Sequence, residues 1–207
     1  RFLTFDEITD RYLGRAFRVA TRLTGESRPS AERGRDARAP HVLGYCLGGT
    51  LTAIHAAAHP DSMSSLTLLA APIGFHDDGL LSKWTRAKGF DVDAVVAGTG
   101  NVPWQLLQGA FQLLRPTLAL SKAVGVLDRF WDDAFLDGFF ALETWGNDNV
   151  ALPGAFYQRY IDELYRGDAL IAGRFSLRGR ALRLADVGCP TLAVTFEHDN
   201  IVPAASA

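Results

Sequence analysis

The chain is poor in cysteine, in net charge and in long apolar runs, and each shortage excludes a class of protein. Its two cysteines, Cys46 and Cys189, are too few for a disulfide framework, so we expect a reducing, cytoplasmic setting. The formal net charge is −2, and without a basic excess the chain is not expected to bind nucleic acid. No apolar run approaches the roughly 18–20 residues that a membrane span requires, and no signal peptide is recognisable.

What is present is the composition of a single globular domain. The 207 residues are 48% hydrophobic and 21% charged, which suffices for one buried core. The chain begins at Arg1 without a methionine and ends at Ala207 just after a strand-like segment. We therefore interpret residues 1–207 as part of one domain of a longer polypeptide.

Short apolar segments alternate with helical patterns along the chain. Candidate strands cover residues 41–45, 65–71 and 190–196. Apolar positions at helical spacing predict an amphipathic helix over about residues 5–23, and an Ala-rich stretch predicts a second over residues 49–58. This order predicts an α/β fold whose sheet is mostly parallel and doubly wound.

Two longer segments lie outside this alternation. Residues 26–40 are rich in Arg, Ser, Gly and Pro, and they predict an exposed loop. Residues 74–169 are largely helical in pattern, and we interpret them as a helical cap or lid. This segment contains all four tryptophans, Trp84, Trp104, Trp131 and Trp145.

One short motif indicates catalytic chemistry. Residues 44–49 read Gly-Tyr-Cys-Leu-Gly-Gly and lie between the first strand and the Ala-rich helix. A nucleophile elbow is such a strand-to-helix turn, and small residues beside the nucleophile let the two backbones approach closely. We therefore predict Cys46 as the nucleophile, with Gly44, Gly48 and Gly49 as the small residues of the elbow.

The N-terminus of the helix after the motif is also expected to stabilise negative charge, both on the thiolate and on an oxyanion. A helix N-terminus favours negative charge, so we expect it to help lower the pKa of the Cys46 thiol. The backbone N–H of Leu47, directly after the nucleophile, is the expected first donor of an oxyanion hole. Cys189 lies beside Pro190 at the start of a strand, and we predict that it is a structural thiol.

An acid and a histidine should accompany the nucleophile. Asp199 directly follows the third strand, where an acid would orient a histidine, although an ordinary turn aspartate fits the same position. The expected chain order is nucleophile, acid, histidine, and no histidine follows Asp199. We expect the catalytic histidine to lie beyond Ala207, with His76 as an alternative base. The histidines present are His41, His55, His59, His76 and His198.

Residues 44–51 resemble the lipase-box-like motif of the polyhydroxyalkanoate synthases, in which cysteine replaces the usual serine. Residues 143–148, 156–173 and 179–192 also resemble that family, and the second of these stretches is typical of its two-subunit, class III type. The segment beginning Asp199-Asn200 falls where the family has its catalytic aspartate. Two departures weaken the assignment to a type: Asn200 where the family commonly has histidine, and Ala204 where single-subunit members often have tryptophan.

The resemblance implies an α/β-hydrolase fold with a cysteine, histidine and aspartate triad. It implies an acyltransferase that polymerises (R)-3-hydroxyacyl-CoA through a thioester on Cys46 and releases CoA. Leu47 would supply an oxyanion N–H, and Asp199 would serve the histidine or help to activate the incoming 3-hydroxyl. We expect no cofactor and no metal. A partner synthase subunit or a homodimer, and a place at the surface of polyester granules, are further expectations.

Two other functions fit the same residues. A thioesterase, an esterase or an intracellular polyhydroxyalkanoate depolymerase would use Cys46 in the same way but resolve the acyl-enzyme with water. A non-catalytic relative that acts as a partner subunit would keep the fold without the reaction. The retention of Cys46, its flanking glycines and Asp199 argues against the non-catalytic alternative.

Overall fold

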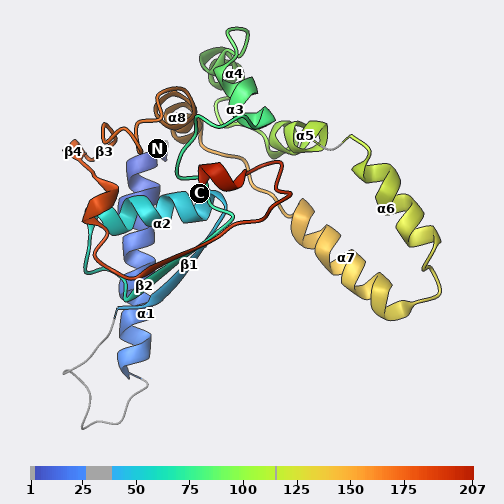
Figure 1. The fold of residues 1–207 in the computed structure, drawn as a ribbon, viewed down its shortest axis with the longest axis horizontal. Coiled ribbons are helices and arrows are strands. Elements are labelled where there is room, and N and C mark those ends of the chain that lie inside the picture. The colour runs from blue at the N-terminus through green and yellow to red at the C-terminus, as the bar shows by residue number, and fades with distance from the viewer. Residues whose placement is uncertain (1–2, 27–38, 115) are drawn as a thin grey trace.

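The structure is a computed structural model that describes residues 3–26, 39–114 and 116–207. The loop predicted over residues 26–40 falls mainly on residues 27–38, outside the described residues. Figure 1 shows a body in which helices pack around a small sheet, and a helical arm that extends away from this body.

The body is built on a sheet of three parallel strands in the order β1-β2-β5. The strands are β1 (His41–Tyr45), β2 (Ser65–Leu69) and β5 (Thr191–Val194). All three predicted strands are therefore confirmed, although the second and third are shorter than predicted. Strand β2 ends where Ala70 takes a φ of 46°, a left-handed conformation that interrupts the pleat.

Helix α2 (Leu47–Ala58) covers one face of this sheet. Every residue from Gly49 to Ala58 is buried, and the small side chains of this Ala-rich stretch let the helix lie close to the strands. In β2 the alternate residues Leu66 and Leu68 are 1% and 7% exposed, as expected when one face of a strand lies against a core. The helix predicted over residues 49–58 is confirmed and begins two residues earlier.

The predicted N-terminal helix consists of two consecutive elements. A π-helix, η1 (Glu7–Tyr12), leads into α1 (Leu13–Glu26), and both pack against α2. Ahead of them Phe5 is fully buried, and its ring stacks on that of Phe156 with centroids 4.9 Å apart. These contacts fix the N-terminal segment against the core, and Figure 1 shows α1 crossing α2.

The chain between β2 and β5 is largely helical, as predicted for residues 74–169. Its elements are α3 (Leu80–Arg86), α4 (Val92–Thr99), α5 (Trp104–Leu114), α6 (Leu118–Leu127), α7 (Asp133–Asn147), α8 (Gly154–Arg159) and the π-helix η2 (Tyr160–Arg166). Helices α5, α6 and α7 form the arm, and α6 and α7 bury none of their residues. By contrast, α8 and η2 belong to the central core, where Phe156, Ile161 and Leu164 are at most 2% exposed. Residues 74–169 therefore do not form a single cap, because one part projects as the arm and another part belongs to the core.

A short antiparallel hairpin, which the sequence pattern does not predict, precedes β5. Its strands are β3 (Ser176–Leu177) and β4 (Arg180–Ala181). Arg178 and Gly179 in its turn have φ of 50° and 77°, the positive values that a two-residue hairpin turn needs to match strand twist. Two 3-10 turns, η3 (Leu184–Asp186) and η4 (Ala204–Ser206), complete the described elements. None of the described helices is long and apolar enough to cross a membrane.

Candidate active site

Cys46 sits in a strained turn between β1 and α2. Its φ of 50° and ψ of −128° lie in a region that residues other than glycine rarely occupy. Backbone hydrogen bonds on both sides hold this conformation. The Cys46 N–H donates to the carbonyl of Leu69 at 2.9 Å, and the Cys46 carbonyl accepts from the N–H of Gly49 at 2.8 Å. Such a fixed, strained residue at a strand-to-helix turn is the backbone geometry of a nucleophile elbow.

The glycines around Cys46 explain how strand and helix approach so closely. A Cβ added at Gly44 would lie 2.4 Å from the Cα of Gly49 and 2.4 Å from the Oγ1 of Thr52. A Cβ added at Gly49 would lie 2.2 Å from the Cβ of Ala71. At Gly48 an added Cβ would meet no described atom within 4 Å, so the steric reason that predicted a small residue there is wrong. The close contact is made one residue later, at Gly49.

The thiol environment differs from the expected one. Burial raises the pKa of the Cys46 thiol, the hydrogen bond from the Leu47 N–H lowers it in part, and the negative charge of Asp199 raises it further. The expected effect of the helix N-terminus is therefore present but smaller than the cost of burial. The prediction that the elbow lowers this pKa is wrong for the net shift, and Cys46 is largely protonated at neutral pH.

Asp199 lies near the thiol because β1 and β5 are parallel and end at the same edge of the sheet. Its charge acts on the pKa of both Tyr45 and Cys46. Its Oδ1 accepts hydrogen bonds from the N–H groups of Ile201 at 2.8 Å and Val202 at 2.9 Å. These bonds are those of an ordinary Asx turn, and they also fix the direction of the carboxylate.

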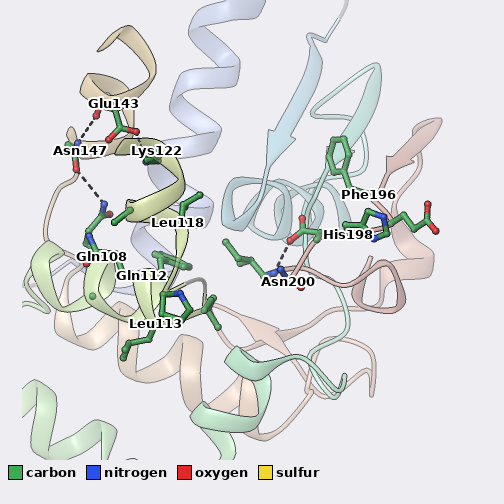
Figure 2. Close-up of a pocket in the computed structure, with 18 residues that line it drawn as sticks. Gln108, Gln112, Leu113, Leu118, Lys122, Glu143, Asn147, Phe196, His198 and Asn200 are labelled. Atoms are coloured by element: carbon green, nitrogen blue, oxygen red, sulfur yellow. Dashed lines mark hydrogen bonds and ion pairs between the residues drawn. The ribbon is translucent and has the colours of Figure 1, made fainter. Parts of the chain in front are cut away.

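Among the described residues, no histidine is hydrogen-bonded to Cys46 or to Asp199. The alternative base, His76, instead has its Nε2 3.1 Å from the carbonyl oxygen of Arg166. His198 adjoins Asp199 in sequence, and both residues line a cavity between the arm and the loop after β5. Figure 2 shows His198 there beside Phe196 and Asn200. The other three histidines bond to groups remote from the thiol: His41 to Ser65, His55 to Thr9 and His59 to Asp10.

Two tyrosines lie within electrostatic reach of the thiol, and the sequence analysis missed them. The side chains of Tyr160 and Tyr165 are hydrogen-bonded to each other, and their ring centroids are 5.3 Å apart. Burial raises the pKa of both hydroxyls, and a charge on Cys46 would raise each further, so both remain protonated donors. Both lie in the stretch 156–173 that resembles the polyhydroxyalkanoate synthases, but neither that resemblance nor their spacing of five residues assigned them a role at the site.

A cavity of about 1170 Å³ separates the arm from the loop that follows β5. Figure 2 shows its two walls, with Leu113 and Leu118 on the arm and Phe196 and His198 opposite. The arm side is braced by an ion pair of 2.5 Å between Lys122 of α6 and Glu143 of α7. Asp199 lines this cavity, but Cys46 does not.

The arm also reaches the strand that carries the nucleophile. The ring of Trp145 on α7 lies 6.4 Å, between centroids, from that of Tyr45 at the end of β1. Trp145 is nevertheless 65% exposed, so this contact leaves most of its surface free.

Comparison with known proteins identifies the class. A family model described as the alpha/beta hydrolase fold matches residues 36–207. The chain therefore belongs to the α/β-hydrolase fold family, in agreement with the parallel sheet and the elbow geometry of Cys46.

Its relatives within this family are polymerases. The chain is 27% identical over 203 residues to the poly(3-hydroxyalkanoate) polymerase subunit PhaC of Haloarcula marismortui, covering 97% of this chain and 40% of that protein. It is 31% identical over 165 residues to the protein of that name from Allochromatium vinosum, with 79% and 46% covered. It is 28% identical over 218 residues to that of Cupriavidus necator, with 97% and 33% covered. The chain thus spans less than half the length of these relatives, and the resemblance to the polyhydroxyalkanoate synthases is confirmed.

Proposed function

We propose that this protein is an acyltransferase that polymerises (R)-3-hydroxyacyl-CoA into a polyester and releases CoA. The observation that carries the proposal is the strained backbone of Cys46 between β1 and α2, in a chain similar to poly(3-hydroxyalkanoate) polymerases. A cysteine suits this reaction because its thiolate exchanges readily with a thioester, and the acyl-enzyme stays reactive towards an alcohol.

The proposed reaction has two transfers. In the first, the Cys46 sulfur attacks the thioester carbonyl, a new C–S bond forms, the C–S bond to CoA breaks, and CoA leaves with the proton that Cys46 gave up. The N–H of Leu47 stabilises the oxyanion of this step. In the second, the 3-hydroxyl of an incoming hydroxyacyl-CoA attacks the Cys46 thioester, an ester C–O bond forms, the C–S bond to Cys46 breaks, and the hydroxyl proton returns to the Cys46 sulfur. The lengthened chain is then a CoA thioester, and it returns to Cys46 by the first transfer.

Both transfers require a base: the first because the pKa of the Cys46 thiol is raised, and the second because the attacking 3-hydroxyl must lose its proton. Because burial and Asp199 both favour the protonated thiol, the carboxylate alone does not generate the thiolate. We assign this role to a histidine outside the described residues, oriented by Oδ2 of Asp199, since Oδ1 already accepts from Ile201 and Val202. The protonated hydroxyls of Tyr160 and Tyr165 are candidates for the second oxyanion donor.

The cavity beside Asp199 suits an acyl chain. Apolar side chains of the arm, including Phe111, Leu113 and Leu118, face Phe196 and Ile201 across it. We assign this cavity to the growing polyester and the arm to a cap that limits access of water, because water would hydrolyse the Cys46 thioester.

The test is made on the protein expressed from its complete reading frame. The protein is incubated with (R)-3-hydroxybutyryl-CoA, free CoA is followed with a thiol reagent, and the product is analysed. We expect CoA release with insoluble polymer. Cys46→Ala should reduce the rate by roughly a thousandfold or more, whereas Cys189→Ala, the matched thiol control, should leave it unchanged.

Each other outcome has a defined meaning. CoA release that depends on Cys46 but leaves only free hydroxy acid would make the protein a thioesterase-type hydrolase. CoA release that survives Cys46→Ala would remove Cys46 as the nucleophile. A complete absence of CoA release would favour the non-catalytic relative.

We also propose that the arm contacts a partner synthase subunit, a second copy of the protein or the polyester itself. Large apolar side chains of α6 and of the turn after it lie open to solvent: Leu120 is 69%, Leu127 70% and Trp131 70% exposed. Apolar surface concentrated in this way on one projecting element supports an interaction surface. It is also compatible with a location at a granule surface.

A further inference from the structure

Three side chains of types that can bind a metal meet where η1 packs against α2. Asp10 comes from the π-helix η1, and His55 and His59 come from α2; one candidate ligand atom of each lies within 4.8 Å of the others. The spacing of four residues places both histidines on one face of the helix, with ring centroids 4.7 Å apart. At a rise of about 1.5 Å per residue, His55 lies about 14 Å along α2 from Cys46, so this cluster is separate from the candidate active site.

His55 is held in the tautomer that a metal ligand needs. Its Nδ1 lies 2.8 Å from the carbonyl oxygen of Thr9, and because a carbonyl only accepts, Nδ1 carries the proton. The lone pair is therefore on Nε2. The side chain is only 2% exposed, which fixes the ring. A backbone carbonyl that fixes the tautomer in this way is the usual support of a metal-bound histidine.

Asp10 is held as an ionised carboxylate by two different partners. Its Oδ1 lies 2.6 Å from Nε2 of His59, and its Oδ2 accepts a hydrogen bond from Nε of Arg178. One carboxylate oxygen is thus fixed by a guanidinium, while the other points at the histidines.

The surroundings leave room for an ion. All three side chains line a cavity of about 790 Å³. Gly14 faces the His55 ring, since a Cβ added there would lie 3.1 Å from Cε1 and 3.8 Å from Nε2. The Oγ of Ser62, which lines the same cavity, is buried without a hydrogen-bond partner among the described residues. Three arginines line this cavity: Arg178 is paired with Asp10, Arg11 is paired with Glu7, and a guanidinium nitrogen of Arg18 lies beside Gly14 near the His55 ring.

We propose that Asp10, His55 and His59 bind a divalent transition-metal ion, with Zn²⁺ as the best match, and that a fourth position is taken by water. Two imidazole nitrogens and one carboxylate oxygen form a ligand set that zinc uses. Tetrahedral zinc places its nitrogen and oxygen ligands about 3.3 Å apart, and the present separations, from 2.6 Å to at most 4.8 Å, span that value. The ion would replace the direct contact between His59 and Asp10 and would tie the N-terminal segment to α2.

The experiment titrates Zn²⁺ into the protein in a Cys46→Ser, Cys189→Ser background, because free thiols also bind zinc. Calorimetry should show one ion per chain, and the ¹⁵N signals of the imidazoles should shift at His55 and His59 but not at His41, His76 or His198. The midpoint of thermal unfolding should rise with zinc concentration. The imidazole signals identify the histidines that bind the ion without mutation of any ligand residue.

Two variants test the assignment of ligands. His59→Ala removes a half-exposed ligand, and Asp10→Asn removes the anionic one while keeping its shape; each should weaken binding at least about tenfold. His41→Ala, a matched change of another exposed histidine, should leave the affinity unchanged. The proposal is overturned if no saturable binding occurs up to about 1 mM Zn²⁺, or if the shifted imidazoles are not His55 and His59. It is equally overturned if His59→Ala binds as tightly as His41→Ala, and the three groups are then a purely structural ion-pair network.

Discussion

Helix α2 and the arm formed by α5, α6 and α7 are both rich in apolar residues, yet α2 is buried and most of the arm is exposed. In α2 every residue from Gly49 to Ala58 is buried, and the helix lies directly on the sheet. In the arm, α6 and α7 bury no residue at all, and their side chains face solvent, the cavity beside Asp199 or, at Trp145, the ring of Tyr45. Apolar content alone therefore does not say where the core lies; residue size and the packing partner decide it.

The sharpest test of this contrast compares two leucines. Leu66→Ala removes a side chain that is 1% exposed in β2, and it should lower the free energy of unfolding by about 2–5 kcal/mol through lost burial and a cavity. Leu127→Ala removes one that is 70% exposed in α6, and it should change this free energy by less than about 0.5 kcal/mol. Urea unfolding of both variants measures the difference. Equal losses would show that the arm is packed in solution, against a partner or another copy.

A second comparison uses glycines. Gly49→Ala places a Cβ 2.2 Å from that of Ala71, so we expect a loss of about 1–3 kcal/mol in unfolding free energy from overpacking. Gly138→Ala, within α7, meets no described atom within 4 Å and should gain up to about 1 kcal/mol from helix propensity. Opposite signs in denaturant unfolding are the expected result, and a loss at Gly138 would place an unrecognised contact on the arm.

A third test isolates the strain at the elbow. At a φ of 50° a side chain is strained and glycine is not, so Cys46→Gly should be more stable than Cys46→Ala by about 1 kcal/mol. Both variants lack the thiol, so the difference reports the backbone alone. Equal stabilities in thermal and urea unfolding would mean that the elbow relaxes when the thiol is removed.

The smallest expected effect concerns the thiol pKa. Because burial and Asp199 raise the pKa of Cys46, its alkylation by iodoacetamide should begin at a higher pH than that of a cysteine in a short peptide. Asp199→Asn removes one of the two raising influences, so it should lower the pKa and speed alkylation at a given pH. The measurement is made in a Cys189→Ala background, so that only one thiol reacts. A slower reaction in Asp199→Asn would contradict the assigned position of the carboxylate.

Much of the fold was predictable because its signals are local. The three strands, helix α2 and the turn at Cys46 follow from apolar runs, an Ala-rich stretch and glycines that are adjacent in sequence. The likeness of the 44–51 motif to the polyhydroxyalkanoate synthases pointed to a family that the comparisons support. The hairpin at Arg178 was missed because its strands have two residues each, too few for a periodic pattern.

The candidate site was predictable only in part. Cys46 and Asp199 were predicted as site residues because Cys46 directly follows β1 and Asp199 lies in the loop after β5, and parallel strands end together. The direction of the thiol pKa was wrong, since it depends on how much of the surrounding structure covers the sulfur. The tyrosines at positions 160 and 165 were missed, because nothing in their local sequence indicates that their hydroxyls lie within electrostatic reach of Cys46.

The sequence by itself determined the parallel sheet, the strand-to-helix turn at Cys46 and the place of Asp199 after the last strand, because these depend on residue types at fixed short spacings. Only the tertiary structure decided which part of residues 74–169 is core and which is arm, since burial depends on the partners that a helix meets. It alone brought Asp10 to His59, which lies 49 residues away, in a chain for which the sequence suggested no metal. The electrostatics, the burial and the geometry of such a cluster depend on contacts between residues that are far apart in sequence, so a local sequence pattern does not predict them.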